Sequence, residues 1–471
     1  MAAAPASAER MTEGSIGKKI FRFAWPLFLG NLFQQLYNIA DTLIVGNMLG
    51  NNALAAVSST GSLVFLLVSL FNGVSMGSGV VVSRFFGAKD FNRMRKAVHT
   101  AMAFGLTAGV AVSVFGALAS PQILIWMDTP PEVLSESVAY IRVYFAGALG
   151  MVMYNCCMGI MQAVGDSKHP LQYLIISSII NVVLDIVMIA VFHMGVAGAA
   201  LATIIANFIS FFLCLIRLVR TDEPQKVQLR KIRFDLPSLK LIIQYGLPSG
   251  LQNSIIALAN VVVQSNINSF GEMAMAGCGA YAKIEGFAFL PITSFTMAIT
   301  TFVGQNLGAQ EYERTKKGAR FGMLCSIILA EVIGVLIFVT APLLTRAFTA
   351  EPEAIWFGVQ KARTCALFYC LLALSHCIAA VLRGAGRAVI PMVTMMAFWC
   401  IVRVAFLSIL TPIFRDIAVV NWVYPLTWSL SSIALMIYYL KADWLHGFEK
   451  ASRLHLHGHH FHFHGKHFHS R

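Results

Sequence analysis

Residues 85–97 read FFGAKDFNRMRKA, and residues 306–318 read NLGAQEYERTKKG. In both segments the pair Gly-Ala is followed two positions later by an acidic residue, and then by several basic ones. Gly87 corresponds to Gly308, so the two segments lie 221 residues apart. A motif that recurs at such a distance indicates an internal repeat.

A second pair of segments supports this repeat. QAVGDSKHP (162–170) resembles LRGAGRAVIP (382–391), and Gly165 aligns with Gly386, again 221 residues further on. Two independent pairs with one separation predict that the chain consists of two similar halves joined in tandem.

The composition is that of an integral membrane protein. The 471 residues are 57% hydrophobic and only 12% charged, with a mean hydropathy of +0.71. Soluble domains are about 25% charged. Apolar stretches of roughly 20 residues, enough to cross a bilayer as helices, recur along the chain. Because alternating strand-like segments of about ten residues are absent, an all-α fold is expected and not a barrel.

We predict twelve transmembrane helices in two pseudo-symmetric six-helix bundles. The predicted spans are 20–48, 53–83, 95–119, 133–160, 170–192, 196–219, 240–268, 273–303, 314–340, 354–381, 388–411 and 419–440. Both halves begin on the same side of the membrane, so they form a parallel repeat. The predicted domains are an N-terminal tail (1–16), the N-terminal bundle (17–219), a linker (220–237), the C-terminal bundle (238–442) and a His-rich tail (443–471).

Most of the 35 basic residues fall in the loops on one side of the predicted membrane. By the positive-inside rule both termini and the linker are cytoplasmic, as expected for a multi-pass protein of the plasma (inner) membrane. The net charge of +13 therefore reflects topology. Because the basic residues are spread through short loops and form no single patch, we expect no nucleic-acid partner.

Polar side chains gather at one depth of the first half. At 1.5 Å per residue, Asp41 lies about 12 Å below the outer surface. Asp185 of the fifth span lies at a similar depth, with Asn181 one turn earlier on the same face. Thr203 of the sixth span and Tyr140 of the fourth complete this level. We expect these five side chains to converge inside the N-terminal bundle.

Carboxylates at such depths are rare and tend to mark ion or proton pathways. Two that lie close together cannot both ionise cheaply, so the pair could take up and release a proton, or hold Na⁺. The alternative is a structural pair that pins helices together. The equivalent positions of the second half are Val263 and Phe406, so packing of the repeat does not require acids there. If Na⁺ is bound, its expected ligands are Asp41, Asn181, Asp185 and Thr203.

Fewer charges lie within the second half. Glu285 could be a second coupling acid, or could form a structural ion pair with Lys283 or Arg403. Lys361 lies near the outer end of its span, where a long side chain can extend to the surface. Pro26 interrupts the first span, and the resulting kink could be a hinge or a static bend.

The C-terminal tail contains HLHGHHFHFHGKHFH (455–469), which could bind Zn²⁺, Ni²⁺ or Cu²⁺ loosely or be a disordered appendage. No P-loop, HExxH or GxSxG pattern occurs, so neither an ATP-driven pump nor an enzyme is indicated. We expect no cofactor other than the coupling ion.

The sequence resembles the multidrug and toxic compound extrusion (MATE) transporters, in the DinF- and MepA-like branch. The resemblance rests on the two half-length repeats, on the four loop segments and on the segment WPLFLGNLFQQLYNIADTLIVGNMLG (25–50). The resemblance covers about residues 14–445. It implies a V-shaped pair of bundles and antiport of organic cations against H⁺ or Na⁺. It also implies a cation site at the residues that match the family pattern, which are Asp41, Tyr140, Asn181, Asp185 and Thr203. Some members of the family carry acids on helices seven, eight and ten. In this sequence Glu285 of the eighth span matches the family acid only approximately, and the tenth span has no carboxylate after Glu353.

We therefore predict a monomeric secondary transporter that exports small organic, cationic compounds by alternating access. The alternative is a flippase of lipid-linked precursors with a related fold, which would favour an arginine-rich cavity. A membrane-embedded hydrolase using the two aspartates is a third class, separable by product analysis.

Overall fold

The computed structural model describes residues 10–126 and 131–448, apart from some side chains between residues 51 and 68, and this part of the chain is helical without strands. The elements are α1 (Ile16–Leu49), α2 (Asn51–Gly87), α3 (Phe91–Trp126), α4 (Pro131–Ala146), α5 (Ala148–Ala163), α6 (Lys168–Ile186), η1 (Val187–Val191), α7 (Gly195–Arg220), η2 (Leu229–Lys231), α8 (Leu236–Asn268), α9 (Glu272–Gly308), α10 (Tyr312–Arg346), α11 (Pro352–Cys365), η3 (Ala366–Phe368), α12 (Tyr369–Gly384), α13 (Val389–Met395), η4 (Met396–Val402), α14 (Arg403–Phe414) and α15 (Ile417–Lys441).

Each predicted span corresponds to one helix or to one interrupted helix. In the described residues, nine helices are long and apolar enough to cross a membrane, and the bent pair α4 and α5 makes up to ten. The remaining two spans are α1 and α2, helices of 34 and 37 residues that lie alongside the others. The fourth span bends by 47° at the junction of α4 and α5, and its counterpart in the second half breaks at η3. The predicted all-α membrane fold is confirmed.

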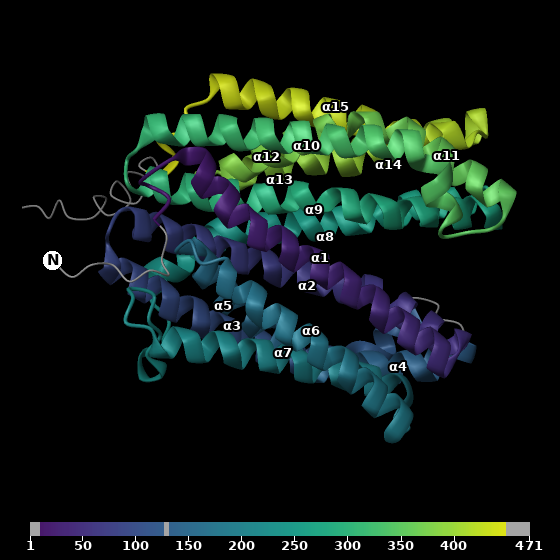
Figure 1. The fold of residues 1–471 in the computed structure, drawn as a ribbon, viewed down its shortest axis with the longest axis horizontal. Coiled ribbons are helices and arrows are strands. Elements are labelled where there is room, and N and C mark those ends of the chain that lie inside the picture. Colours follow the sequence, from purple (N-terminus) through teal and green to yellow (C-terminus); the bar gives the residue numbers. More distant parts are fainter. Residues whose placement is uncertain (1–9, 127–130, 449–471) are drawn as a thin grey trace, which may run out of the picture.

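The helices form two bundles, with α1 to α7 in one and α8 to α15 in the other (Figure 1). The bundles meet at the end where the linker and the described chain ends lie, and they diverge toward the opposite end. The first helix of each half leans toward the other bundle. Ile20 and Phe23 of α1 pack against Phe295 of α9, while Ile242 of α8 belongs to the core shared with α2.

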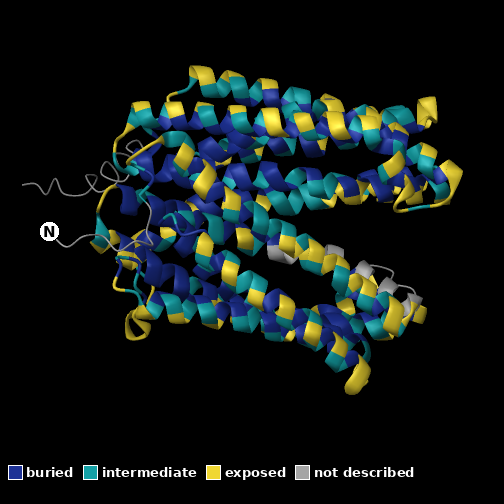
Figure 2. Cartoon of the chain, viewed as in Figure 1, coloured by how far each residue is buried: buried dark blue, intermediate teal, exposed yellow. Residues whose placement is uncertain are grey.

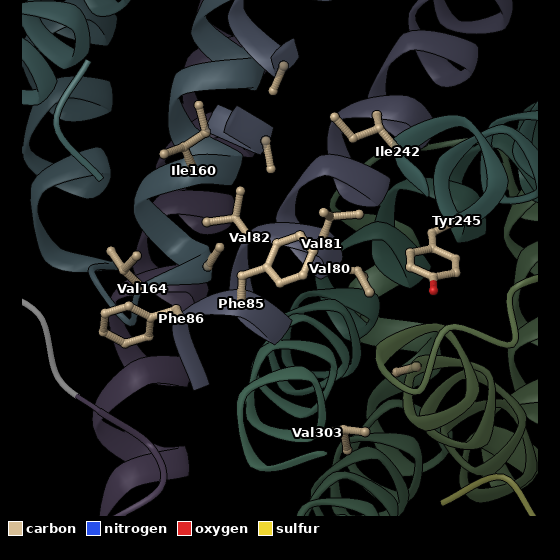
Figure 3. Packing of buried hydrophobic residues seen from close by; sticks show 14 of the residues in the cluster. Val80, Val81, Val82, Phe85, Phe86, Ile160, Val164, Ile242, Tyr245 and Val303 are labelled. Carbon is tan, nitrogen blue, oxygen red and sulfur yellow. The ribbon is translucent and has the colours of Figure 1, made fainter. Parts of the chain in front are cut away.

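The largest hydrophobic core lies where the bundles meet. Figure 3 shows Val81 and Phe85 of α2 beside Tyr245 of α8 and Val303 of α9, all buried. Toward the diverging end more of the residues are partly or fully exposed (Figure 2). Among the described residues, burial of apolar surface therefore joins the bundles chiefly at this end.

Glycines allow α2 and α8 to touch backbone to backbone in this core. A Cβ atom on Gly73 would fall on the backbone of Gly250, and one on Gly77 would fall on the backbone of Gly246. Close approach of this kind is typical of helix pairs inside membranes.

The repeated loop motifs make a second reciprocal contact. A Cβ atom on Gly87 would fall on the carbonyl of Gln305, and one on Gly308 would fall on the carbonyl of Arg84. The two motif glycines therefore let the last turns of α2 and α9 cross at the joined end of the bundles. This contact gives the repeated segments 85–97 and 306–318 a structural role.

The segment that precedes α1 packs against this crossing of α2 and α9. Met11 is buried, and its N–H donates to Gln305 Oε1 at 2.9 Å. Gln305 Nε2 donates in turn to the carbonyl of Ala163 at 2.8 Å. Arg314 donates to the Met11 carbonyl through Nε and Nη2 at 3.1 and 3.0 Å. Part of the predicted N-terminal tail thus closes the joined end of the bundles.

Candidate cation site in the first bundle

The carboxyl groups of Asp41 on α1 and Asp185 on α6 lie within hydrogen-bonding distance of each other. Asp185 is fully buried and Asp41 is partly buried. A carboxylate can only accept hydrogen bonds, so this contact becomes a hydrogen bond only when one partner carries a proton. Two ionised carboxylates this close would repel strongly. Such a pair can share one proton or hold one cation between its carboxyl groups.

The other three predicted residues surround this pair. Asn181 lies one turn before Asp185 on α6, is buried, and donates to Thr203 Oγ1 of α7 at 3.4 Å. Tyr140 of α4 is buried in a cluster with Val45 of α1. Its phenol is close enough to interact electrostatically with both aspartates. The structure thus brings together all five residues that the sequence placed at one depth.

Several oxygen atoms of this group have no donor among the described residues. They are Asp41 Oδ1, Asn181 Oδ1 and both carboxylate oxygens of Asp185. Buried acceptors are almost always hydrogen-bonded, because desolvation without a partner is costly. Four unsatisfied oxygens from two helices are the donor set that a hard cation such as Na⁺ prefers, and they equally suit a shared proton.

A change of helix type follows Asp185 directly. The α-helix ends at Ile186, and residues 187–191 form a π-helical turn. π turns widen the helix, free backbone groups from the regular pattern and are frequent at functional sites. Ile189 of this turn packs beside Tyr140 in the cluster around the site. The irregular backbone therefore borders the site directly after Asp185.

Sequence reasoning missed two aromatic neighbours. Tyr37 lies one turn before Asp41 on α1 and is close enough to interact electrostatically with Asp41 and Asp185. Tyr144 stacks on Tyr140 with ring centroids 6.1 Å apart. Tyr144 lies one turn after Tyr140 in α4, so the i, i+4 spacing was a signal that could have found it.

Pro26 lies in the part of α1 nearer the joined end of the bundles, away from the carboxylates. It is partly buried and borders a cavity of about 80 Å³ between α1, α5 and α6, which Asn31, Gln34 and Gln162 also line. This empty space beside the proline leaves α1 room to change its bend. The structure contains one state of α1, so the hinge remains a prediction.

The second bundle holds Glu285 differently from either expected ion pair. Glu285 accepts a hydrogen bond from Tyr281 at 3.0 Å, and no described residue forms a salt bridge with it. Lys283 is exposed near the ring of Phe348, at 5.6 Å. Arg403 is buried and donates to Thr427 at 2.8 Å. Glu285 therefore forms neither of the two proposed salt bridges with a described residue, and its role as a second coupling acid stays a prediction.

Lys361 lies where a long side chain could extend to the surface, but in the structure it does not do so. The side chain is buried, with its ammonium 4.8 Å from the ring centre of Tyr424 and 5.6 Å from that of Tyr281. Cation–π contacts with two rings replace the lost hydration of the charge. Arg403 lies 4.7 Å from the ring centre of the same Tyr424, and Glu285 accepts from Tyr281, so the acid and the two cations share one aromatic cluster.

A further carboxylate, Glu331, lies in the middle of α10 and was missed. One oxygen accepts the backbone N–H of Cys370 at 3.1 Å. Cys370 is in the first turn of α12, directly after the break at η3, where backbone N–H groups have no partner within the helix. Glu331 therefore caps a broken membrane helix, and a carboxylate is favoured at that position by the helix dipole. A lone acid in the apolar run SIILAEVIGVLIF (326–338) was the signal that could have found it.

Replacing this cap should destabilise the second bundle. Glu331→Leu leaves the Cys370 N–H without an acceptor, at a cost of about 2 kcal/mol. Glu331→Gln retains a carbonyl oxygen that can accept this N–H, so it should lose little stability. Thermal unfolding of the purified protein in detergent would measure both variants, and equal melting temperatures for the two would contradict the capping role.

Residues 10–126 and 131–448 contain no further candidate metal site outside the Asp41 and Asp185 pair. No group of three or more His, Cys, Asp or Glu side chains there could hold a metal ion. The histidine-rich segment 455–469 lies outside the described residues.

The fold and the site define a multi-pass membrane transporter built from two repeated bundles. The family model MatE matches residues 26–187 and again residues 248–409, once in each half. The chain belongs to the MatE family. Members of this family are transporters and not enzymes, so the predicted family and the absence of enzymatic function are both confirmed.

Individual relatives agree with this assignment. "Probable multidrug resistance protein YoeA" of Bacillus subtilis is 29% identical over 445 residues, which cover 92% of this chain and 96% of that protein. "Multidrug export protein MepA" of Staphylococcus saprophyticus is 23% identical over 72% of this chain and 75% of its own. The solved structure described as "Outward-facing conformation of a multidrug resistance MATE family transporter of the MOP superfamily" has a TM-score of 0.84 at 22% identity. It covers 96% of this chain and 100% of its own. This likeness extends the shared fold over almost the whole chain.

Proposed function

We propose that the protein is a secondary active efflux antiporter that exports organic, cationic compounds in exchange for H⁺ or Na⁺. Relatives named as multidrug resistance and multidrug export proteins support the export of drugs. The coupling is inferred from the buried pair Asp41 and Asp185.

The unpartnered oxygens of this pair carry the proposal. A structural pair would be expected to satisfy its acceptors with donors from neighbouring helices. Here both oxygens of Asp185 lack a donor among the described residues, although the side chain is fully buried. Such a site is costly when empty and ionised, and binding of a proton or Na⁺ relieves the cost. Its occupancy is therefore linked to the conformation around it.

In the proposed cycle a proton or Na⁺ enters the pair from the predicted outer end, where the bundles diverge. Its binding draws α1 toward α6 and displaces substrate outward. Asn181 and Thr203 would complete the shell of a bound Na⁺, whereas a proton would be shared between the two carboxyl groups. Exchange results because the two ligands favour different conformations.

Transport by the purified protein in vesicles tests this function. Ethidium movement should follow an imposed pH gradient or an imposed Na⁺ gradient, each applied in separate experiments. A response to pH alone identifies H⁺, and a response to Na⁺ alone identifies Na⁺. Absence of ethidium movement under both gradients, for protein that retains its normal melting temperature, would overturn the proposal.

The described residues give little support to the flippase alternative. A pyrophosphate-binding cavity needs several accessible cations. Arg403 and Lys361 are buried against aromatic rings in the second bundle instead.

A further inference from the structure

A cavity of about 260 Å³ lies outside the transport site, where the linker after α7 folds back over the beginning of α3. We call it the linker cavity. It is lined by Arg95, Lys96, His99, Asp222, Glu223, Lys226, Gln228, Lys231, Arg233 and Asp235. The cavity lies on the side that the basic loops predict to be cytoplasmic.

Hydrogen bonds to α3 hold the linker in place. The N–H of Gln228 donates to His99 Nε2 at 3.0 Å, and His99 Nδ1 lies 2.7 Å from the carbonyl of Arg95. Since Nε2 accepts, the ring proton must be on Nδ1. Further along, the N–H of Asp235 donates to the buried Thr100 at 3.0 Å. Because these bonds fix residues 228 and 235 against α3, the second half of the linker is held over the cavity.

Positive charge is in excess in the linker cavity. Lys96 pairs with Asp235 at 3.8 Å, and Lys226 pairs with Asp222 at 3.2 Å. The remaining basic side chains, Arg95, Lys231 and Arg233, form no salt bridge with a described residue. The hydrogen bond from Ser238, with help from Lys96 and Arg233, holds the pKa of Asp235 below its usual value, so this carboxylate stays ionised at neutral pH. Even so, five basic groups face three acids.

Exposed apolar side chains flank these charges. Leu229, Phe234 and Leu236 are 56%, 49% and 76% exposed, and all lie within or directly after the linker. Leu236 is the first residue of α8, which then enters the membrane. Basic and large apolar residues that alternate at a membrane boundary are typical of segments that lie in the lipid interface. Solvent alone would leave this apolar surface unfavourably exposed.

We propose that the linker cavity binds the phosphate headgroup of an anionic phospholipid. Arg95 and Arg233 would donate paired hydrogen bonds to the phosphate oxygens, and Lys231 would add a third positive charge. Leu229, Phe234 and Leu236 would lie among the acyl chains of the same leaflet. Because the linker connects the two bundles, the bound lipid would tie the start of α8 to α3. This inference is independent of the ion and the drugs that are transported.

The second half offers a matched control. Arg95 and Lys96 correspond by the repeat to Lys316 and Lys317 at the beginning of α10. There the chain after α15 covers the helix instead, and His446 packs on Tyr312 with ring centroids 4.9 Å apart. Lys316 and Lys317 line none of the cavities described above. Lys317 and Lys316, which pairs with Glu313 at 3.0 Å, therefore carry positive charge at the equivalent helix start but outside the linker cavity.

Thermal unfolding of the lipid-free full-length protein in detergent tests the proposal. Short-chain phosphatidylglycerol should raise the melting temperature by roughly 3 °C or more, because a ligand that binds only the folded state stabilises it. Phosphatidylcholine should have no such effect. The triple variant Arg95→Gln/Lys231→Gln/Arg233→Gln should lose the shift, and Lys316→Gln/Lys317→Gln should keep it. All variants should retain the lipid-free melting temperature, since the exchanged side chains are on the surface.

Three results would overturn the proposal. The first is a shift in the triple variant equal to that of the wild type. The second is an equal shift with phosphatidylcholine. The third is an equal shift with inorganic phosphate, which would assign the cavity to a free anion. A double variant, Leu229→Ser/Phe234→Ser, separates the two parts of the site and should weaken the response to phosphatidylglycerol.

Discussion

Asp41→Asn should reduce ethidium efflux to the level of vesicles without protein, while the variant reaches the membrane in normal amounts. Asparagine has nearly the same shape as aspartate, so packing around α1 is retained. It cannot ionise, however, and an amide opposite Asp185 can neither share a proton with it nor supply a second negative charge for Na⁺. Asp185→Asn should have the same effect.

The double variant Asp41→Asn/Asp185→Asn should be no worse than either single variant, because the two carboxylates form one site and their effects are not additive. Glu331→Gln is the matched control. It exchanges a membrane carboxylate for an amide outside the site and should transport normally. Undiminished efflux by Asp41→Asn would contradict the assignment of this residue to coupling.

Gly87→Ala and Gly308→Ala should each lower the melting temperature by roughly 5 °C or more. The added methyl group of each variant would fall on a backbone carbonyl of the crossing helix, at Gln305 or at Arg84. Backbone cannot move aside as a flexible side chain can, so α2 and α9 must separate. This separation would also disturb the docking of Met11 on Gln305.

Gly279→Ala is the control for these two substitutions. Gly279 lies in α9 as well, but a Cβ atom there would meet nothing within 4 Å. Alanine favours a helix over glycine by about 1 kcal/mol, so this variant should be neutral or slightly more stable. Loss of stability in Gly279→Ala equal to that in Gly308→Ala would show that the close crossing is not the cause.

The candidate site was predictable because its residues break a rule of membrane helices. Ionised Asp41 and Asp185 are energetically unfavourable within apolar spans, and the regular rise of a helix places both at one depth. Residue spacing could not show that Asn181 donates to Thr203 while its own oxygen lacks a donor, because this depends on side-chain geometry. The π turn after Asp185 gave no recognisable sequence signal either.

Other charges were misjudged because their partners are distant in the chain. Lys361 looked like a residue able to reach the surface, but its neighbours Tyr281 and Tyr424 come from two other helices. Glu331 caps the break after η3 only because α10 packs beside it. Hydropathy along one helix cannot show which side chains from other helices surround a charge.

The sequence by itself determined the helical class, the two repeated halves and the depth of the paired carboxylates. These properties follow from local periodicity, from the bilayer thickness and from the separation between similar motifs. Only the tertiary structure decided how α2 and α9 cross at Gly87 and Gly308, where Met11 docks and how the linker cavity forms on α3. Such contacts join residues up to about 300 positions apart, and their energies depend on close packing between whole helices, which no single segment encodes.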